Sequence, residues 1–479
     1  MEINPLIFRN YDIRGKVDDD LDETKVEALG RAYGTLLHEL GISEEIPVGR
    51  DCRLSGPGYM KAFIRGVGKT GIDVIDLGDV MTQMVYFAQY HFKSRGGAMI
   101  SASHNPKNYN GFKLAINFSL TTGPEEVQRI RKIAEQDSYY MPDKQGKIRP
   151  ENIREAYIKD VLKRIKLEKK FKIVVDSHHG STGYYNPEIF RKAGCEVIEV
   201  MSKVDGSFPA GTPDPTDAHV VANLAKHVLK EKADVGFTYD GDGDRIGLVD
   251  EKGDILWNDV AVAIFSKEIL EKKPGSKIVY NTLCSQVVPL VIEEFGGIPV
   301  IWKTGHAFIK AKIAEVGAPF GGELSGHFFF KDNAYGYDDG TYASLRILQY
   351  LARKNETLSH LYASFPRFIS SPEIKIGCPD DKKKDVIKDL SPKFKADFPE
   401  AKITDESVIP GDDGVRADMP DGAIVVRYSQ NGPYITVKFE AQDEETYEKR
   451  RLYIRNLLKS YPEMIWEDEL CVNLDVVLK

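Results

Sequence analysis

Short apolar runs and amphipathic stretches alternate along the first three quarters of the chain. Runs of four to six apolar residues between polar loops predict buried strands, and apolar positions at helical spacing predict helices. Alternation of this kind is typical of an α/β layer fold. The pattern predicts strands at 72–75, 97–100, 111–116, 172–176, 233–238, 246–249, 277–280 and 299–302, and helices at 23–41, 57–66, from 186, at 285–295 and after the loop 303–306 through residue 316.

The pattern changes in the last quarter, where a strand at 373–376 and a helix at 382–390 precede strands near 423–426 and 434–439 and a helix at 444–458. This order is typical of an α+β domain. A polar segment with prolines and a glycine at 137–155 marks the first boundary. We expect three similar α/β domains with mixed sheets and a C-terminal α+β domain, at 1–150, 151–253, 254–368 and 369–479.

The stretch Ser101-Ala102-Ser103-His104-Asn105-Pro106 follows one of the predicted strands. Asn-Pro ends a strand because proline has no N–H for the ladder. Ser103 should therefore lie at the strand tip with His104 beside it. In the next strand Phe112, Leu114 and Ile116 share one face, so Lys113 points from the other. A serine oxygen needs a base or charge-stabilising partners to act as a nucleophile. An ordinary turn is the other interpretation of this stretch.

An acidic loop separates the predicted strands at 233–238 and 246–249. Asp240, Asp242 and Asp244 alternate with glycines, a spacing that lets a loop surround Mg²⁺ or Ca²⁺ with carboxylate oxygens. An EF-hand does not fit, because Arg245 takes the position that requires glycine and the flanks are strands. An acidic hairpin turn is the alternative, although three such carboxylates repel one another without a cation. Together with Ser103 and nearby basic residues, the loop indicates phosphoryl transfer.

Two further polar loops have the composition of binding sites. Glu323, Ser325 and His327 alternate, so on an extended segment they face one side and suit sugar hydroxyls; a polar strand face has the same pattern. Arg427-Tyr428-Ser429-Gln430-Asn431-Gly432-Pro433 offers guanidinium, hydroxyl, amide and backbone donors, as a phosphate cradle does. A plain hairpin turn fits this segment equally well.

One glycine-rich segment imitates a nucleotide-binding motif. Gly66-Val67-Gly68-Lys69-Thr70-Gly71 matches GxGxxG, but it follows a helix and precedes a strand, the reverse of a dinucleotide fingerprint. We interpret it as a turn from helix to strand.

Composition narrows the class of protein. The 479 residues carry a net charge of −8, with 42% hydrophobic and 29% charged residues, which argues against a broad nucleic-acid or anionic-membrane surface. The five cysteines are scattered, and the N-terminus has no apolar leader. We expect a cytoplasmic protein, without nucleic-acid or membrane partners, that is a monomer or a small homo-oligomer.

The motifs occur in an order that resembles the α-D-phosphohexomutase superfamily, most closely phosphomannomutase/phosphoglucomutase, over essentially the whole chain. The stretches that carry this resemblance are 11–15, 101–106 with 110–113, 240–245, 303–306, 322–327 and 427–433. The resemblance implies a cytoplasmic isomerase of carbohydrate metabolism whose four domains surround a central cleft.

The resemblance also implies a mechanism. Ser103 would be a phosphoserine that exchanges its phosphoryl group with hexose 1- and 6-phosphates (mannose, glucose or both) through a hexose 1,6-bisphosphate, and glucose 1,6-bisphosphate would activate the enzyme. Ser103, Asp240, Asp242 and Asp244 would hold Mg²⁺. His104 and Lys113 match positions proposed for acid–base work, and Arg14 and Arg245 match residues near the phosphoserine. The substrate-binding residues would be Tyr11, Lys303, Thr304, Gly305, His306, Glu323, Ser325, His327, Arg427, Ser429 and Asn431.

Two segments depart from the family pattern, and a third position bears on the choice of substrate. Gln430 and Asn431 replace a usual Asn-Thr pair, and Leu283 stands where relatives often carry lysine. Leu324 is apolar, as in the mannose and glucose enzymes, whereas the glucosamine branch usually has glutamine there. Phosphoglucosamine mutase is the alternative function, and a non-catalytic protein that binds sugar phosphate or metal is the alternative of another class.

Overall fold

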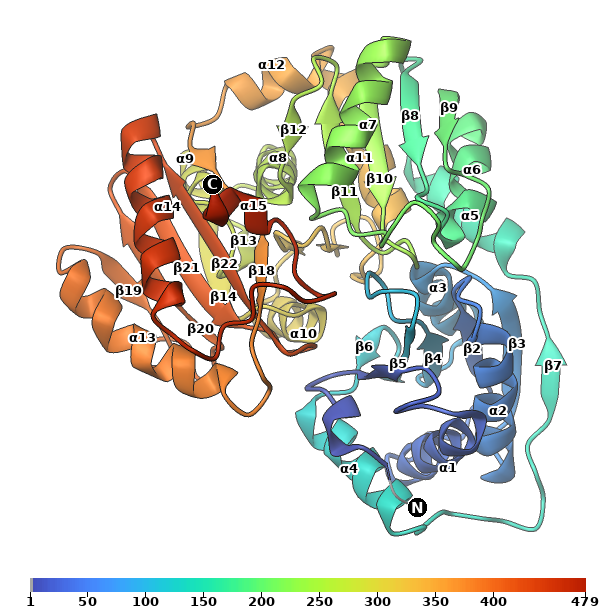
Figure 1. The fold of residues 1–479 in the computed structure, drawn as a ribbon. Coiled ribbons are helices and arrows are strands. Elements are labelled where there is room, and N and C mark those ends of the chain that lie inside the picture. The colour runs from blue at the N-terminus through green and yellow to red at the C-terminus, as the bar shows by residue number, and fades with distance from the viewer. Residues whose placement is uncertain (1–2) are drawn as a thin grey trace. The chain divides into compact units, whose positions relative to one another are not determined.

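The computed structural model describes residues 3–479, which form four mixed or antiparallel β-sheets with flanking helices (Figure 1). The predicted fold class, three α/β domains followed by an α+β domain, is confirmed. No helix within residues 3–479 is long and apolar enough to cross a membrane. The arrangement of the domains around a cleft stays a prediction.

The first sheet has the strand order β1-β5-β4-β2-β3-β7, with β6 paired to β5. The pairings β2–β3, β2–β4 and β3–β7 are parallel, whereas β5 runs antiparallel to β1 and β4. Its elements are η1 (Pro5–Ile7), β1 (Ile13–Lys16), α1 (Glu23–Glu39), β2 (Ile46–Arg50), α2 (Gly56–Lys69), β3 (Val74–Asp79), α3 (Thr82–Phe92), β4 (Gly97–Ile100), β5 (Tyr109–Asn117), β6 (Leu120–Thr121), α4 (Pro124–Glu135) and β7 (Ile148–Pro150).

The expected turn from helix to strand is present but shorter than predicted, because residues 66–69 form the last turn of α2 and only Thr70 and Gly71 lie in the turn itself. Gly66 faces α1 so closely that a Cβ would lie 2.2 Å from the carbonyl oxygen of Glu27. Glycine at position 66 therefore allows α1 and α2 to pack closely. The sequence alone does not distinguish a glycine with this role from a glycine in a turn.

The second sheet has the order β12-β11-β10-β8-β9. A polar loop follows each of its central strands, β8, β10 and β11. β8 and β9 are parallel, and β11 and β12 are antiparallel. Its elements are α5 (Arg154–Arg164), β8 (Lys172–Asp176), η2 (Ser181–Tyr184), α6 (Asn186–Lys192), β9 (Glu196–Val200), α7 (Ala218–Glu231), β10 (Val235–Tyr239), β11 (Ile246–Asp250) and β12 (Ile255–Leu256).

The third sheet has the order β14-β13-β15-β16, with β16 antiparallel to its neighbour. Helix α10 packs on it through Ile309 and Ile313, against Val279 and Phe329. The elements are α8 (Asn258–Leu270), β13 (Lys277–Asn281), α9 (Val287–Glu294), β14 (Ile298–Trp302), α10 (His306–Val316), β15 (Phe320–Gly322), β16 (Phe328–Phe330), α11 (Gly340–Lys354) and α12 (Leu358–Ala363).

The fourth sheet is antiparallel at every described pairing. Apolar residues of β18 and β20 to β22 pack against α13 and α14 in one core. Helix α13 continues past its predicted end, with Pro392 inside it. The elements are β17 (Ile369–Ser370), β18 (Ile374–Gly377), α13 (Lys383–Asp397), β19 (Lys402–Thr404), β20 (Gly414–Met419), β21 (Gly422–Tyr428), β22 (Tyr434–Ala441), α14 (Glu444–Lys459) and α15 (Leu474–Leu478).

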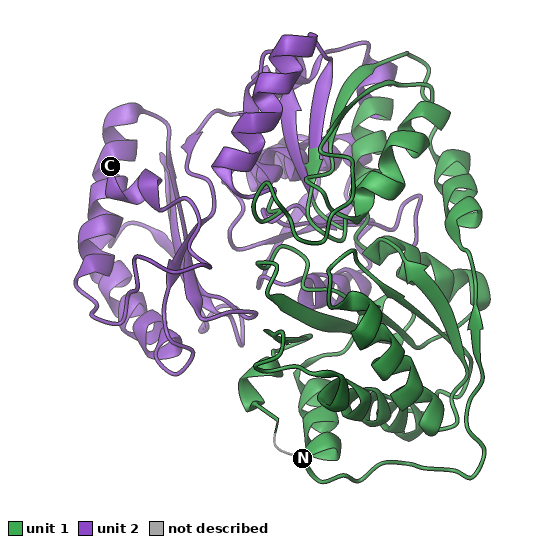
Figure 2. Ribbon diagram, turned by 45° about the vertical axis from the view of Figure 1, so that its right-hand side comes forward, with its two compact units in different colours: residues 1–214, 238–245, 336–349 green, residues 215–237, 246–335, 350–479 purple. Residues whose placement is uncertain are grey.

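The chain divides into two compact units, coloured separately in Figure 2. The first unit comprises residues 1–214, 238–245 and 336–349, and the second comprises 215–237, 246–335 and 350–479. The serine stretch and the aspartate loop belong to the first unit, and the loops at 303–306, 322–327 and 427–433 belong to the second.

Candidate active site

Ser103 lies in the turn between β4 and β5, fully buried, with a left-handed backbone (φ 51°). Its hydroxyl donates to Asp240 Oδ2 at 2.6 Å and lies 3.1 Å from His104 Nδ1. The structure therefore brings Ser103 and its neighbour His104 next to the aspartate loop, although Ser103 and Asp240 are 137 positions apart in the chain.

The aspartate loop after β10 places three buried carboxylates together. Oxygen atoms of Asp240, Asp242 and Asp244 all lie within 4.8 Å of one another. Asp242 Oδ1 is buried without a hydrogen-bond partner among the described residues. A convergent set of hard oxygen ligands with an unsatisfied atom fits a divalent cation.

Two cations offset part of this negative charge. Lys113 Nζ donates to Asp242 Oδ2 at 2.7 Å and forms an ion pair with Asp244. Arg245 Nε lies 3.8 Å from Asp240 Oδ2. Lys113 is on the strand face that the sequence predicted, but that face is buried too, so the residue is only 3% exposed.

Burial and the charged neighbours shift the pKa values of this cluster in different directions. Burial and the carboxylates of Asp244 and Asp242 raise the pKa of Asp240 well above its usual range. Burial also raises the pKa of Asp242, but the Lys113 ammonium outweighs it and brings that pKa below the ordinary value. Burial lowers the pKa of Lys113, and the attraction of Asp242 and Asp244 reverses this and raises it. The cluster therefore holds Lys113 as a cation at neutral pH.

Arg14 approaches the serine turn from β1. Its guanidinium donates to Asn105 Oδ1 at 2.8 Å and to Asp12 Oδ2 at 3.0 Å. β1 pairs with β5 so that Arg14 lies opposite Gly111, where a Cβ would come within 2.3 Å of the Ile13 carbonyl oxygen. Tyr11, just before β1, is buried, and its carbonyl accepts a hydrogen bond from Thr122 Oγ1.

Two polar loops of the second unit, 303–306 and 322–327, lie together at one end of the third sheet. Glu323 Oε1 accepts from the Gly305 backbone N–H at 2.7 Å, which ties 322–327 to the segment 303–306. Lys303 lies over the Phe308 ring, and the rings of His306 and His327 are 5.7 Å apart. Thr304 Oγ1 accepts from Asn281 Nδ2 at 3.1 Å.

The predicted geometry of Glu323, Ser325 and His327 is wrong in one respect. The segment is a tight turn in which Glu323 N–H donates to the His327 carbonyl, so the residues do not alternate on an extended strand. The turn still gathers them: His327 Nδ1 lies 3.2 Å from Glu323 Oε2 and 3.1 Å from Ser325 Oγ.

The loop between β21 and β22 carries a guanidinium held in a fixed orientation. Arg427 donates to both carboxylate oxygens of Asp413, at 2.8 Å and 2.5 Å, and to Thr436 Oγ1 at 3.2 Å. The backbone N–H groups of Asn431 and Gly432 both donate to Ser429 Oγ. A bidentate carboxylate fixes the plane of an arginine, which favours recognition of a phosphate.

Comparison with known proteins decides the family. Models described as phosphoglucomutase/phosphomannomutase α/β/α domains I, II and III match residues 5–141, 155–253 and 257–368. The chain belongs to the phosphoglucomutase/phosphomannomutase family. It is therefore a phosphohexomutase, as the sequence predicted.

Individual relatives of this family match over nearly the full chain. The phosphomannomutase/phosphoglucomutase of Pseudomonas aeruginosa is 38% identical, covering 95% of this chain and 96% of the relative. The phosphoglucomutase of Neisseria gonorrhoeae is 35% identical, covering 96% and 98%. A solved phosphoglucomutase/phosphomannomutase family protein from Burkholderia thailandensis is 33% identical, covers 96% of this chain and 98% of its own, and has a TM-score of 0.85.

The two departures from the family pattern have structural counterparts. Gln430 donates from Nε2 to Asp413 Oδ2 at 2.6 Å, so its amide supports the carboxylate that orients Arg427. Leu283 is fully buried, and Arg416 donates to the carbonyl oxygens of the flanking Thr282 and Cys284.

Sequence reasoning missed several residues that contact the family's motifs. Thr82 Oγ1 donates to Asp242 Oδ2 at 2.7 Å, and Asp413 holds Arg427. Asp51 and Arg53 lie behind the serine turn.

Replacing Arg427 by lysine should raise the KM for hexose phosphates about tenfold with a smaller change in kcat. A lysine ammonium cannot form the bidentate contact with Asp413 and cannot present a planar donor edge to phosphate. Steady-state kinetics with glucose 1-phosphate would measure both constants. Arg450→Lys is the control, because Arg450 is a second buried arginine of this domain. An unchanged KM for Arg427→Lys would contradict the assignment of Arg427 as a phosphate-binding residue.

Proposed function

We propose that this enzyme interconverts the 1- and 6-phosphates of mannose and glucose through a phosphoserine at Ser103. The observation that carries the proposal is the buried hydrogen bond from Ser103 Oγ to Asp240, within a cluster of three carboxylates, Lys113 and Arg245. Positioning and charge stabilisation supply most of the catalysis in phosphoryl transfer, and this cluster offers both.

In the proposed reaction, the bond between phosphorus and Ser103 Oγ breaks as the free hydroxyl oxygen of the hexose phosphate bonds to phosphorus. The hydroxyl proton passes to His104, because Lys113 is held as an ammonium that has no free electron pair to accept it, and the Ser103 oxygen is left for rephosphorylation. The bisphosphate intermediate reorients, and its other phosphoryl group returns to Ser103. The sugar contacts must therefore accept the intermediate in two orientations.

The carboxylates of Asp240, Asp242 and Asp244, with an oxygen of the phosphorylated Ser103, would hold Mg²⁺. Bound there, Mg²⁺ would supply positive charge next to the phosphoryl group. The three carboxylates outnumber the two cations Lys113 and Arg245, and a phosphoserine would add a further charge of roughly −2. Hexose 1,6-bisphosphate would serve as the activator that first phosphorylates Ser103.

The remaining contacts divide between the two units. Arg14 and Tyr11 would contact the phosphoryl group and the substrate from the first unit. In the second unit, Glu323, Ser325 and His327 would bind sugar hydroxyls beside Lys303, Thr304, Gly305 and His306, and Arg427, Ser429 and Asn431 would hold the phosphate that does not react. We assign these roles to four domains at 1–150, 151–253, 254–368 and 369–479, in a cytoplasmic monomer or small homo-oligomer that acts on small sugar phosphates alone.

The substrate preference has a direct test. Mannose 1-phosphate and glucose 1-phosphate should each be turned over at least ten times more efficiently than glucosamine 6-phosphate, because Leu324 offers no polar group to an amino sugar. Comparison of kcat/KM for the three substrates, with Mg²⁺ and glucose 1,6-bisphosphate present, measures this. A large preference for glucosamine 6-phosphate would instead identify a phosphoglucosamine mutase.

A further inference from the structure

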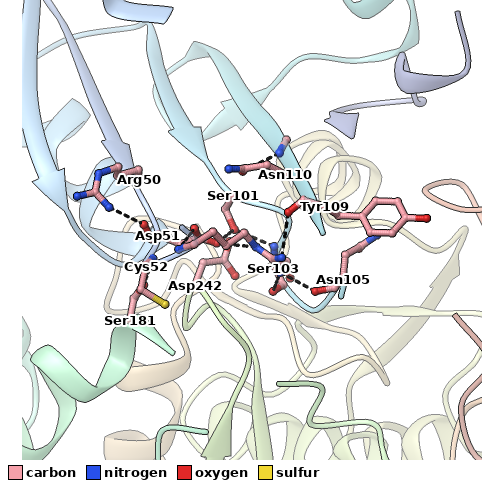
Figure 3. Close-up of polar contacts among 12 residues, drawn as sticks. Arg50, Asp51, Cys52, Ser101, Ser103, Asn105, Tyr109, Asn110, Ser181 and Asp242 are labelled. Atoms are coloured by element: carbon pink, nitrogen blue, oxygen red, sulfur yellow. Dashed lines mark hydrogen bonds and ion pairs between the residues drawn. The ribbon is translucent and has the colours of Figure 1, made fainter. Parts of the chain in front are cut away.

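A buried arginine, Arg53, donates hydrogen bonds to the turn that carries Ser103. Figure 3 labels Ser103, Asn105 and Tyr109 of this turn, together with Asp51 and Ser101. Arg53 is fully buried, and its Nη1 and Nη2 atoms donate to four backbone carbonyl oxygens of one turn. The acceptors are Ser103 at 2.9 Å, Asn105 at 2.7 Å, Pro106 at 2.7 Å and Tyr109 at 3.0 Å. One guanidinium therefore fixes the path of the backbone from Ser103 to the start of β5.

Asp51 and Ser101 connect this arginine to the other side of Ser103. Asp51 Oδ2 accepts from Arg53 Nε at 3.1 Å and from Ser101 Oγ at 2.8 Å. Ser101 Oγ in turn accepts from the Ser103 backbone N–H at 2.8 Å. Both backbone polar groups of Ser103 are thus bound to one network, defined as Asp51, Arg53 and Ser101.

Ser103 needs such support because its backbone is left-handed, with φ 51°. For a residue other than glycine, a left-handed conformation is unfavourable, and it persists where the surroundings enforce it. With its N–H and its carbonyl both held, the direction of the Ser103 side chain is set. In this orientation its Oγ lies 2.6 Å from Asp240 Oδ2.

We propose that Asp51, Arg53 and Ser101 form a positioning network that holds Ser103 in its left-handed conformation for phosphoryl transfer, with Ser101 as the last link. The inference rests on the proposed function of Ser103 as the residue that carries the phosphoryl group. The three residues act through the backbone of Ser103, so they affect the rate of transfer and leave the binding of the sugar phosphate unchanged.

The test compares Ser101→Ala with Ser101→Thr, which keeps the hydroxyl. Ser101→Ala should lower kcat about 30-fold with KM within twofold, because small misplacements of a reacting group can cost up to ~100-fold. Ser101→Thr should stay within about threefold of wild type. Phosphate gain from glucose 1,6-bisphosphate, followed by intact-protein mass, should slow in parallel with kcat for Ser101→Ala.

Ser94→Ala is the matched control, because Ser94 is also fully buried in this unit and donates to the carbonyl of Gly96. It should lower the melting temperature and leave kcat unchanged. Arg53→Lys, measured alongside, should show the same loss of kcat as Ser101→Ala, since lysine cannot reach all four carbonyl oxygens.

Three outcomes would overturn the network's role. The first is unchanged kcat in Ser101→Ala with a lowered melting temperature, which indicates a structural role alone. The second is failure of Ser101→Thr to restore kcat. The third is rescue of Ser101→Ala by excess Mg²⁺, which would place the effect at the aspartate loop instead of at the backbone of Ser103. If wild type itself gains no phosphate, the proposed function fails instead of the network.

Discussion

Ser103→Ala should lower turnover of glucose 1-phosphate by at least ~10⁴-fold, the scale seen when a nucleophile is removed from an enzyme. Without Oγ there is no atom to carry the phosphoryl group between the two positions of the sugar. The fold should survive, because alanine keeps the Cβ and both backbone hydrogen bonds of residue 103. A coupled assay of glucose 6-phosphate formation measures the loss.

Ser94→Ala again serves as the control for loss of a buried serine hydroxyl. Its hydrogen bond to Gly96 is expected to contribute about 1 kcal/mol of stability. Turnover by Ser103→Ala within tenfold of wild type would show that the phosphoryl group travels by another route, and the assignment of Ser103 would be withdrawn.

Asp242→Asn should reduce turnover roughly 100-fold or more at millimolar Mg²⁺, since charge stabilisation by a metal ion is worth several kcal/mol. The substitution removes one of the three negative charges that would bind the metal ion. It also removes one of the two ion pairs of Lys113, so that of Asp242 and Asp244 only Asp244 still pairs with it. Higher Mg²⁺ should restore part of the rate. Wild-type enzyme treated with EDTA should lose turnover and regain it when Mg²⁺ is added.

Asp250→Asn is the matched control, because Asp250 is a buried carboxylate at the end of β11 that accepts from the backbone N–H groups of Lys252 and Asp254. It should alter stability without changing the dependence on Mg²⁺. If Asp242→Asn kept both the wild-type rate and the wild-type Mg²⁺ dependence, the aspartate loop would not be the metal site.

Local patterns were sufficient to identify the candidate residues of the first unit. Ser103 and the alternating aspartates stand out because strand ends, Asn-Pro and glycine spacing are short-range features. The strands β8 and β13 and the helix α10 also lie where their apolar patterns predicted. These elements combine a strong pattern with a clear terminal signal.

The features that sequence reasoning missed depend on contacts between distant segments. Arg53 resembles a surface arginine in sequence, and only the fold surrounds it with four carbonyl oxygens from a turn 50 residues away. The buried face of Lys113 has the same origin, because the aspartates that cover it lie more than 120 residues further on. Gly66 has the sequence context of a turn glycine, and only the packing of α1 against it explains why glycine is needed there.

The most direct test of the phosphoserine is intact-protein mass before and after incubation with glucose 1,6-bisphosphate and Mg²⁺, for wild type and Ser103→Ala. The account predicts that the wild type gains one phosphoryl group and the variant gains none. No gain by the wild type, under conditions that phosphorylate an active mutase of this family, would contradict the account and favour a protein that binds sugar phosphates without transferring them.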